Sequence, residues 1–177
     1  MNFIKKYNLN RHLNRFVKRK ESENVQICAL EKAQSICVLC TFQSPELLEE
    51  TIRAVRSLKN GKNHVALYCY IPDKDNVLTN SDNDVCFISE EDFDFKGSLL
   101  KEKLMSLRAQ SFDILIDLSK DTSLFALYLL GEIKAKFRIG NNEKSKKYYN
   151  LTLYSPHSSC TLIDYFQSIG HYTKKII

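Results

Sequence analysis

Residues 113–119 read DILIDLS, and this short apolar run decides the fold. An apolar run of strand length between polar neighbours is typical of a strand that is buried on both faces, as in a parallel sheet. The helical segment LFALYLL (residues 124–130) follows, and a second strand-like run, AKFRIG, occupies residues 135–140. This strand–helix–strand order predicts a βαβ unit with parallel strands and a right-handed crossover.

The same alternation continues on both sides of this unit. Before it, Ser44 and Pro45 indicate the start of a helix, because a serine caps the first turn and a proline fits the first helical position. The remaining strand-like runs are SICVLCT (35–41), HVALYCYI (64–71), VCFIS (85–89) and YNLTLYS (149–155). We therefore expect a three-layer, Rossmann-like α/β domain with a mostly parallel six-stranded sheet in the order 3-2-1-4-5-6.

Positive charge is concentrated at the N-terminal end of the chain. Residues 1–20 hold seven Lys or Arg and no acid, whereas the rest holds 19 basic and 21 acidic residues. Apolar residues recur there at roughly helical spacing, namely Phe3, Ile4, Tyr7, Leu13, Phe16 and Val17. We therefore divide the chain into a basic amphipathic helical extension, residues 1–24, and a single Rossmann-like domain, residues 25–177.

The basic side chains of this helix are candidates for contact with an anionic surface. They are Lys5, Lys6, Arg11, Arg15, Lys18, Arg19 and Lys20. Such a charge density favours salt-dependent attraction to an anionic membrane or to nucleic acid. Because monomers rarely leave an apolar stripe open to water, the pattern also predicts that the helix packs on the body, on a second copy of the chain or on a protein partner.

The chain holds no apolar run long enough for a signal peptide or a membrane span. We therefore expect it in the cytoplasm, with peripheral attachment to the inner face of the membrane as an alternative. In that compartment the six cysteines are expected to be reduced. Cys37 and Cys40 form a C-x-x-C, but positions three apart on a strand point to opposite faces, so we predict no metal site.

The carboxyl ends of the strands at 35–41 and 113–119 border the crevice in which folds of this type bind ligands. The loop at 40–45 contains no glycine, which disfavours both a dinucleotide fingerprint and a phosphate-binding P-loop. We therefore predict no cofactor and assign no catalytic residue. The candidate ligand-binding residues of the crevice are Thr41, Gln43, Ser44, Asp117, Ser119 and Lys120.

Two charged residues, Asp117 and Arg138, interrupt apolar runs that should form neighbouring strands. Burying either charge alone costs several kcal/mol, because the group loses its hydration. We therefore predict that the two form a structural ion pair or share a hydrogen-bonded network near the carboxyl ends of adjacent strands. A role in facing a ligand is the alternative.

The segment DILIDLSKDTSLFALYLLGEIKAKFRIG (113–140) resembles the N-terminal half of heptosyltransferase-like glycosyltransferases. In those enzymes an Asp-rich strand end, a small-residue helix and a strand ending in Arg-Ile-Gly follow in this order. Asp117, Arg138 and Gly140 fall on matching positions, whereas the loop at 40–45 departs from the pattern. The resemblance implies a second domain for the nucleotide sugar, for which we expect no room here, so glycosyl transfer by this chain alone is disfavoured.

Over nearly its whole length, including EEDFDFKGSLL (90–100), the chain resembles a family of short α/β proteins of Bacteroidetes-type bacteria. That resemblance implies the fold and no particular activity. The sequence therefore favours a non-catalytic binding or interaction module. The alternatives are a small-ligand binder or enzyme related to the acceptor-binding half of the heptosyltransferase-like enzymes, and peripheral binding to an anionic membrane or nucleic acid through residues 1–20.

Overall fold

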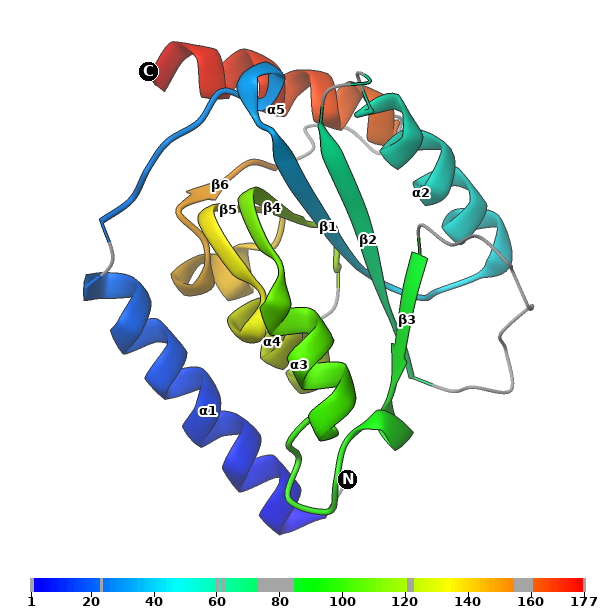
Figure 1. Ribbon diagram of the computed structural model, residues 1–177, viewed down its shortest axis with the longest axis vertical. Coiled ribbons are helices and arrows are strands. Elements are labelled where there is room, and N and C mark those ends of the chain that lie inside the picture. Colours follow the sequence, from blue (N-terminus) through cyan, green and yellow to red (C-terminus); the bar gives the residue numbers. More distant parts are fainter. Residues whose placement is uncertain are drawn as a thin grey trace.

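The computed structural model describes residues 2–22, 24–59, 61, 63–72, 85–120, 123–154 and 161–176. Within them, a six-stranded sheet runs in the order β3-β2-β1-β4-β5-β6, and each neighbouring pair is parallel (Figure 1). The strands are β1 (Ser35–Thr41), β2 (His64–Ile71), β3 (Val85–Ser89), β4 (Ser111–Asp117), β5 (Lys134–Gly140) and β6 (Leu151–Thr152). The predicted α/β class and strand order are confirmed, with β1 and β4 adjacent at the centre.

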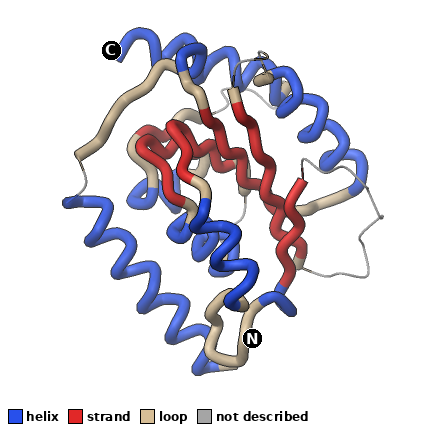
Figure 2. The backbone as a smooth tube through the Cα atoms, in the orientation of Figure 1, coloured by secondary structure: helices blue, strands red, loops and turns tan. Residues whose placement is uncertain are grey.

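Helices cover both faces of this sheet (Figure 2). They are α1 (Phe3–Ser22), α2 (Pro45–Ser57), α3 (Lys101–Ala109), α4 (Leu124–Glu132) and α5 (Leu162–Ile176). On one face, Val55 of α2 and Phe166 of α5 pack in the same cluster as Val38 of β1. On the other face, Leu129 of α4 joins a second cluster with Leu39 of β1. Each face of the sheet therefore has its own apolar core.

The cysteines of the C-x-x-C lie in these two different cores. Cys37 packs on the α4 side of the sheet and Cys40 on the α2 side, which confirms the prediction that they point to opposite faces. Burial raises the pKa of the Cys37 thiol well above its ordinary value, so it stays protonated at neutral pH. Among the residues that the structure describes, no group of three metal-ligating side chains comes together.

Helix α4 is buried on nearly every side, which explains the position of α1. Residues 125–132 of α4 are all buried, as expected for a helix that is apolar all round. One side of α4 packs on the sheet, and α1 covers another with Leu9, Leu13 and Phe16. Gly131 of α4 allows this close approach, because a Cβ there would lie 3.2 Å from Cγ of Phe16. Packing on the body is therefore the arrangement that α1 adopts.

The predicted apolar stripe of α1 is wrong at its N-terminal end. Phe3, Ile4 and Tyr7 are 83%, 56% and 59% exposed, whereas Leu9, which the prediction left out, is fully buried. Successive residues of a helix are rotated by about 100°, so Leu9 and Tyr7 lie on nearly opposite sides. Apolar spacing alone did not define the phase of the buried side, which is set by the surface of α4.

The last strand is shorter than the predicted run at 149–155. Residues 143–148 form the 3-10 helix η4 (Glu143–Tyr148), and β6 pairs with β5 only at Leu151 and Thr152. Tyr149, expected to begin the strand, is instead buried in the core on the α4 side. Ser155 lies outside the described residues.

Candidate functional site

Two of the predicted crevice residues, at the carboxyl ends of β1 and β4, contact each other. Thr41 donates a hydrogen bond from Oγ1 to Oγ of Ser119 at 3.2 Å. Ser44 accepts a hydrogen bond from the backbone N–H of Leu47 at 3.3 Å and thereby caps α2, as its position before Pro45 predicts. These contacts join the end of β1 to the end of β4 and to the first turn of α2.

Two other crevice residues, Gln43 and Lys120, have exposed side chains. The backbone carbonyl of Lys120 accepts a hydrogen bond from Nδ2 of Asn142 at 2.9 Å, which links the segment after β4 to the segment after β5. The structure thus brings Thr41 and Ser119 together and leaves these two side chains to solvent. Their predicted role in holding a ligand stays a prediction.

Asp117 is a buried carboxylate with two hydrogen-bond donors. Its side chain accepts a hydrogen bond from the hydroxyl of Tyr149 at 2.7 Å and another from the backbone N–H of Ser119 at 2.9 Å. Burial raises the pKa of Asp117, and the bonds from Ser119 and Tyr149 oppose that rise. The residue that sequence reasoning missed here is Tyr149, which anchors the segment after η4 to the end of β4.

Gly140 makes room for this contact. A Cβ at Gly140 would overlap the ring of Tyr149, so the glycine that ends β5 lets the ring lie beneath the strand and reach Asp117. The sequence signal was the end of the run at 135–140 on glycine, followed by paired tyrosines after a polar loop. That signal did not indicate which side chain would pack against Gly140.

Arg138 lies on β5, the strand next to that of Asp117, but the two residues are not directly opposite each other in the ladder. In the β4–β5 ladder, Arg138 pairs with Leu115, and Asp117 pairs with Gly140. Arg138 is 3% exposed and donates from Nη2 to the carbonyl of Ile133 at 3.2 Å. The predicted ion pair stays a prediction, whereas the hydrogen bonds from Tyr149 and Ser119 already stabilise the carboxylate.

The basic residues of α1 divide into two groups, of which the first faces the body. Nζ of Lys5 lies 3.1 Å from Oε1 of Glu90, and the Lys5 side chain is buried. Arg19 donates from Nη2 to the carbonyl of Gly131 at 2.8 Å. Lys20 donates to backbone carbonyls at the end of η4. These three cations bind α1 to the body. Lys5 is buried and Lys20 is half-buried, whereas Arg19 is exposed.

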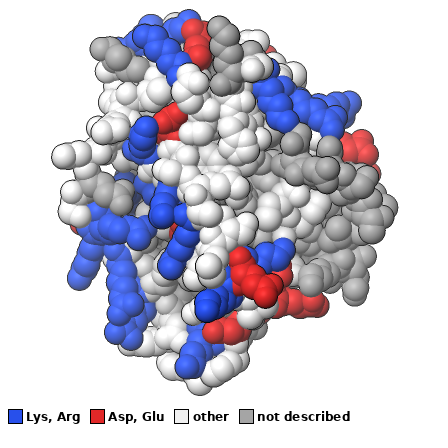
Figure 3. All heavy atoms as spheres, viewed as in Figure 1, with Lys and Arg blue, Asp and Glu red and all other residues white. Residues whose placement is uncertain are grey.

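The second group points away from the body. Lys6, Arg11, Arg15 and Lys18 are exposed, as are the apolar residues near the start of the helix. We use the name outer stripe for the exposed residues that recur at helical spacing along α1, namely Phe3, Ile4, Tyr7, Arg11, Arg15 and Lys18. Figure 3 shows basic side chains projecting from the edge of the molecule that α1 forms. A shallow hollow of about 300 Å³ runs along this stripe between Tyr7 and Lys18.

A cluster of charged and titratable groups around the buried carboxylate of Glu132 lies between α1, α3 and α4, and sequence reasoning missed it. The Glu132 side chain, only 5% exposed, lies 2.6 Å from Nε of Arg108 and 3.3 Å from Nε2 of His12. Burial lowers the pKa of His12 below its ordinary value of 6.5, and Glu132 opposes this shift. His12 also stacks on Tyr128, with ring centroids 4.3 Å apart. The cluster ties α1 to the C-terminal end of α4.

The observed fold and surface define the class of protein as a doubly wound, Rossmann-like α/β domain with an additional outer helix. In the described residues, no helix has the length and apolarity that a membrane span requires. The chain belongs to a family of unknown function (DUF6913), whose model matches residues 5–176 and therefore includes α1 as well as the sheet. Searches of curated proteins and of solved structures give no match.

Proposed function

We propose that this protein is a non-catalytic binding module that docks on an anionic membrane surface through the outer stripe of α1. The observation that supports this function is the division of α1 into two sides. Leu9, Leu13 and Phe16 are buried in the body, whereas the outer stripe displays apolar side chains at one end and cations at the other. A helix lying in a membrane interface needs this combination of apolar and basic side chains.

The exposed apolar residues favour a membrane over nucleic acid. Phe3 and Ile4 are more than half exposed and gather with Tyr7 within two turns of the start of α1. Transfer of such apolar side chains from water to the boundary between headgroups and acyl chains lowers the free energy. A platform for stacking bases would instead interleave aromatic residues with cations along the groove. Beyond Tyr7, the outer stripe continues with cations and without aromatic residues.

The cations of the outer stripe add electrostatic attraction. Each Lys or Arg close to an anionic leaflet contributes about 1 kcal/mol of binding free energy. Arg11, Arg15 and Lys18 lie on successive turns of one rigid helix, so they reach a flat surface together. Since the inner side of α1 is already packed on the body, binding need not include the cost of forming the helix.

Vesicle sedimentation tests this function. The full chain should sediment with vesicles of phosphatidylglycerol and phosphatidylcholine at low salt, should be released at high salt, and should not bind phosphatidylcholine alone. The variant Arg11→Glu with Arg15→Glu should bind more than about tenfold more weakly, because each reversal replaces attraction by repulsion. Its matched control is Arg53→Glu with Lys175→Glu, which makes the same charge change at exposed positions on α2 and α5.

The outcomes of this experiment separate the candidates. Equal binding by the two double variants would contradict docking through the outer stripe. If the chain bound single-stranded RNA but not anionic vesicles, its partner would be nucleic acid and the membrane proposal would be wrong. Loss of vesicle binding in the α1 variant alone supports the proposal.

A second function uses the crevice, and the contact between Thr41 and Ser119 at its border supports it. In this alternative, Gln43 and Lys120, which are exposed, would contact a small ligand beside Thr41 and Ser119. A ligand that binds only the folded chain raises its melting temperature. If this function is correct, a nucleotide sugar or a sugar phosphate should therefore raise the melting temperature of the chain in a thermal-shift screen. No shift, together with vesicle binding, would favour the membrane module.

A further inference from the structure

The opposite edge of the sheet, at the amino ends of β4 and β5, carries a cleft of about 640 Å³. It lies between the C-terminal ends of α1, α3 and α4, so it is separate from the predicted crevice. We call it the basic cleft, after the charged residues in its lining, which are Arg19, Arg108, Glu132, Lys134, Lys136 and Arg138. Its volume falls within the range of small-molecule sites, about 300–1,000 Å³.

Positive charge dominates the lining of the basic cleft. Among its described lining residues, five are basic and one, Glu132, is acidic. Arg108 forms an ion pair with Glu132 at 2.6 Å, and Lys136 forms one with Asp113 at 2.8 Å. Within the part of the chain that the structure describes, and with Asp113 counted as well, five cations stand beside two carboxylates. An anionic ligand would offset this excess of like charge.

Two of the guanidinium groups lie over the same aromatic ring, that of Phe16. The guanidinium of Arg138 lies 5.2 Å from the ring centroid of Phe16, and that of Arg19 lies 5.6 Å from the same ring. Backbone carbonyls at the end of α4 accept hydrogen bonds from both arginines. Their positions are therefore set by α1 and α4 before any ligand arrives, which lowers the entropy lost on binding.

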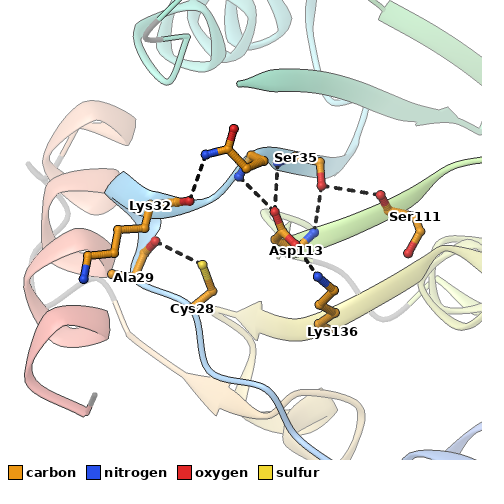
Figure 4. A network of polar contacts seen from close by, with 8 residues as sticks. Cys28, Ala29, Lys32, Ser35, Ser111, Asp113 and Lys136 are labelled. Atoms are coloured by element: carbon orange, nitrogen blue, oxygen red, sulfur yellow. Dashed lines mark hydrogen bonds and ion pairs between the residues drawn. The ribbon is translucent and has the colours of Figure 1, made fainter. Parts of the chain in front are cut away.

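The rim of the cleft is also fixed, as Figure 4 shows. The Asp113 carboxylate accepts hydrogen bonds from Nζ of Lys136 at 2.8 Å and from the backbone N–H groups of Gln34 and Ser35 at 2.8 and 3.1 Å. The bond from Lys136 is the main cause of the lowered pKa of Asp113, so the carboxylate stays ionised at neutral pH. This network joins β1, β4 and β5 and holds Lys136 at the edge of the cleft.

We propose that the basic cleft binds a small ligand that carries a di- or triphosphate group. Such a group concentrates several negative charges in a small volume, which matches cations that converge from α1, α3 and β5. The planar guanidinium of arginine donates two parallel hydrogen bonds to phosphate oxygens, and three of the five cations are arginines. The ligand is a nucleoside polyphosphate or inorganic polyphosphate, and the arms of the test distinguish these sources.

Isothermal titration of the full chain with inorganic tripolyphosphate, and separately with ATP, tests the proposal. Both should bind, and Lys134→Glu should weaken both by about tenfold or more, since it reverses an exposed cation in the cleft. The matched control is Arg53→Glu, an exposed reversal of equal size on α2 at the other face of the sheet. Its affinities should equal those of the unaltered chain.

Each outcome decides the matter. Tighter binding of ATP than of tripolyphosphate would identify a nucleotide, and equal or weaker binding of ATP would identify inorganic polyphosphate. Absence of binding by both probes would overturn the proposal. Equal weakening by Lys134→Glu and Arg53→Glu would also overturn it, because the attraction would then follow net charge alone.

Discussion

On the inner side of α1, Leu9, Leu13 and Phe16 are at most 2% exposed, whereas Phe3 and Tyr7 on the outer stripe are more than half exposed. Both sides combine apolar residues with cations. The two sides differ in their neighbours. The inner side of α1 packs on α4, a helix that is apolar on nearly every side. The neighbouring helix therefore determines which side of an amphipathic helix is buried. The apolar residues on the other side stay exposed and are available for binding.

The largest expected effect is on stability, because substitutions on the two sides of α1 should change the free energy of unfolding by different amounts. Leu13→Ala should lower the free energy of unfolding by about 2–5 kcal/mol, because it leaves a cavity between α1 and α4. Ile4→Ala removes an apolar side chain from the outer stripe, 56% exposed, and should change stability by less than about 0.5 kcal/mol. Urea denaturation measures both. Equal effects at the two positions would show that α1 does not pack on the body in solution.

A smaller effect is expected where η4 is anchored beneath α1. Tyr149→Phe removes the hydroxyl that donates to Asp117 at 2.7 Å and leaves a buried carboxylate with one donor fewer. The loss should be about 1–3 kcal/mol in the free energy of unfolding. Tyr154→Phe, at a tyrosine that is 53% exposed, is the control and should be neutral. A neutral Tyr149→Phe would mean that the Asp117 carboxylate does not depend on this bond.

The pH dependence of stability should sharpen the comparison further. The pKa of His12 is lowered by burial in the folded chain, so below about pH 6.5 the unfolded chain binds more protons than the folded one. Stability should therefore fall as the pH drops from 6.5 through the lowered pKa of the folded state. His12→Gln should reduce this fall, and His171→Gln, at an exposed position on α5, should not. Thermal melts at pH 7.5, 6.5 and 5.5 would measure it, and identical slopes for both variants would show that protonation of His12 is not the cause.

The sheet could be predicted from sequence because each central strand is a continuous apolar run bounded by polar residues. DILIDLS and SICVLCT are too short for helices and too apolar for exposed strands, so adjacent burial in a parallel sheet was the favoured solution. The phase of α1 could not be predicted in this way, because Phe3, Ile4, Tyr7, Leu13 and Phe16 recur at spacings that fit more than one side of a helix. The apolar run LFALYLL of α4 was the missed signal, since a helix that is apolar on nearly every side needs a cover on its outer side.

The sites were harder to predict because they depend on contacts between distant segments. Asp117 was correctly singled out as a buried charge, but its partner Tyr149 is 32 residues away and follows the 3-10 helix η4. The basic cleft combines Arg19 with β5 residues more than a hundred positions later, and no local motif marks it. Chain charge indicated seven contact residues on α1, yet three of them serve to hold the helix on the body.

The most direct test of docking through α1 uses a fluorescent reporter on the outer stripe. The chain contains no tryptophan, so Tyr7→Trp introduces a single one at a position that is 59% exposed. With vesicles containing phosphatidylglycerol, its emission should shift to the blue and become protected from aqueous quenchers, because the ring enters the membrane interface. Tyr172→Trp, on α5 and 48% exposed, should stay unchanged. An unshifted Tyr7→Trp, or an equal shift at both positions, would contradict docking through the outer stripe.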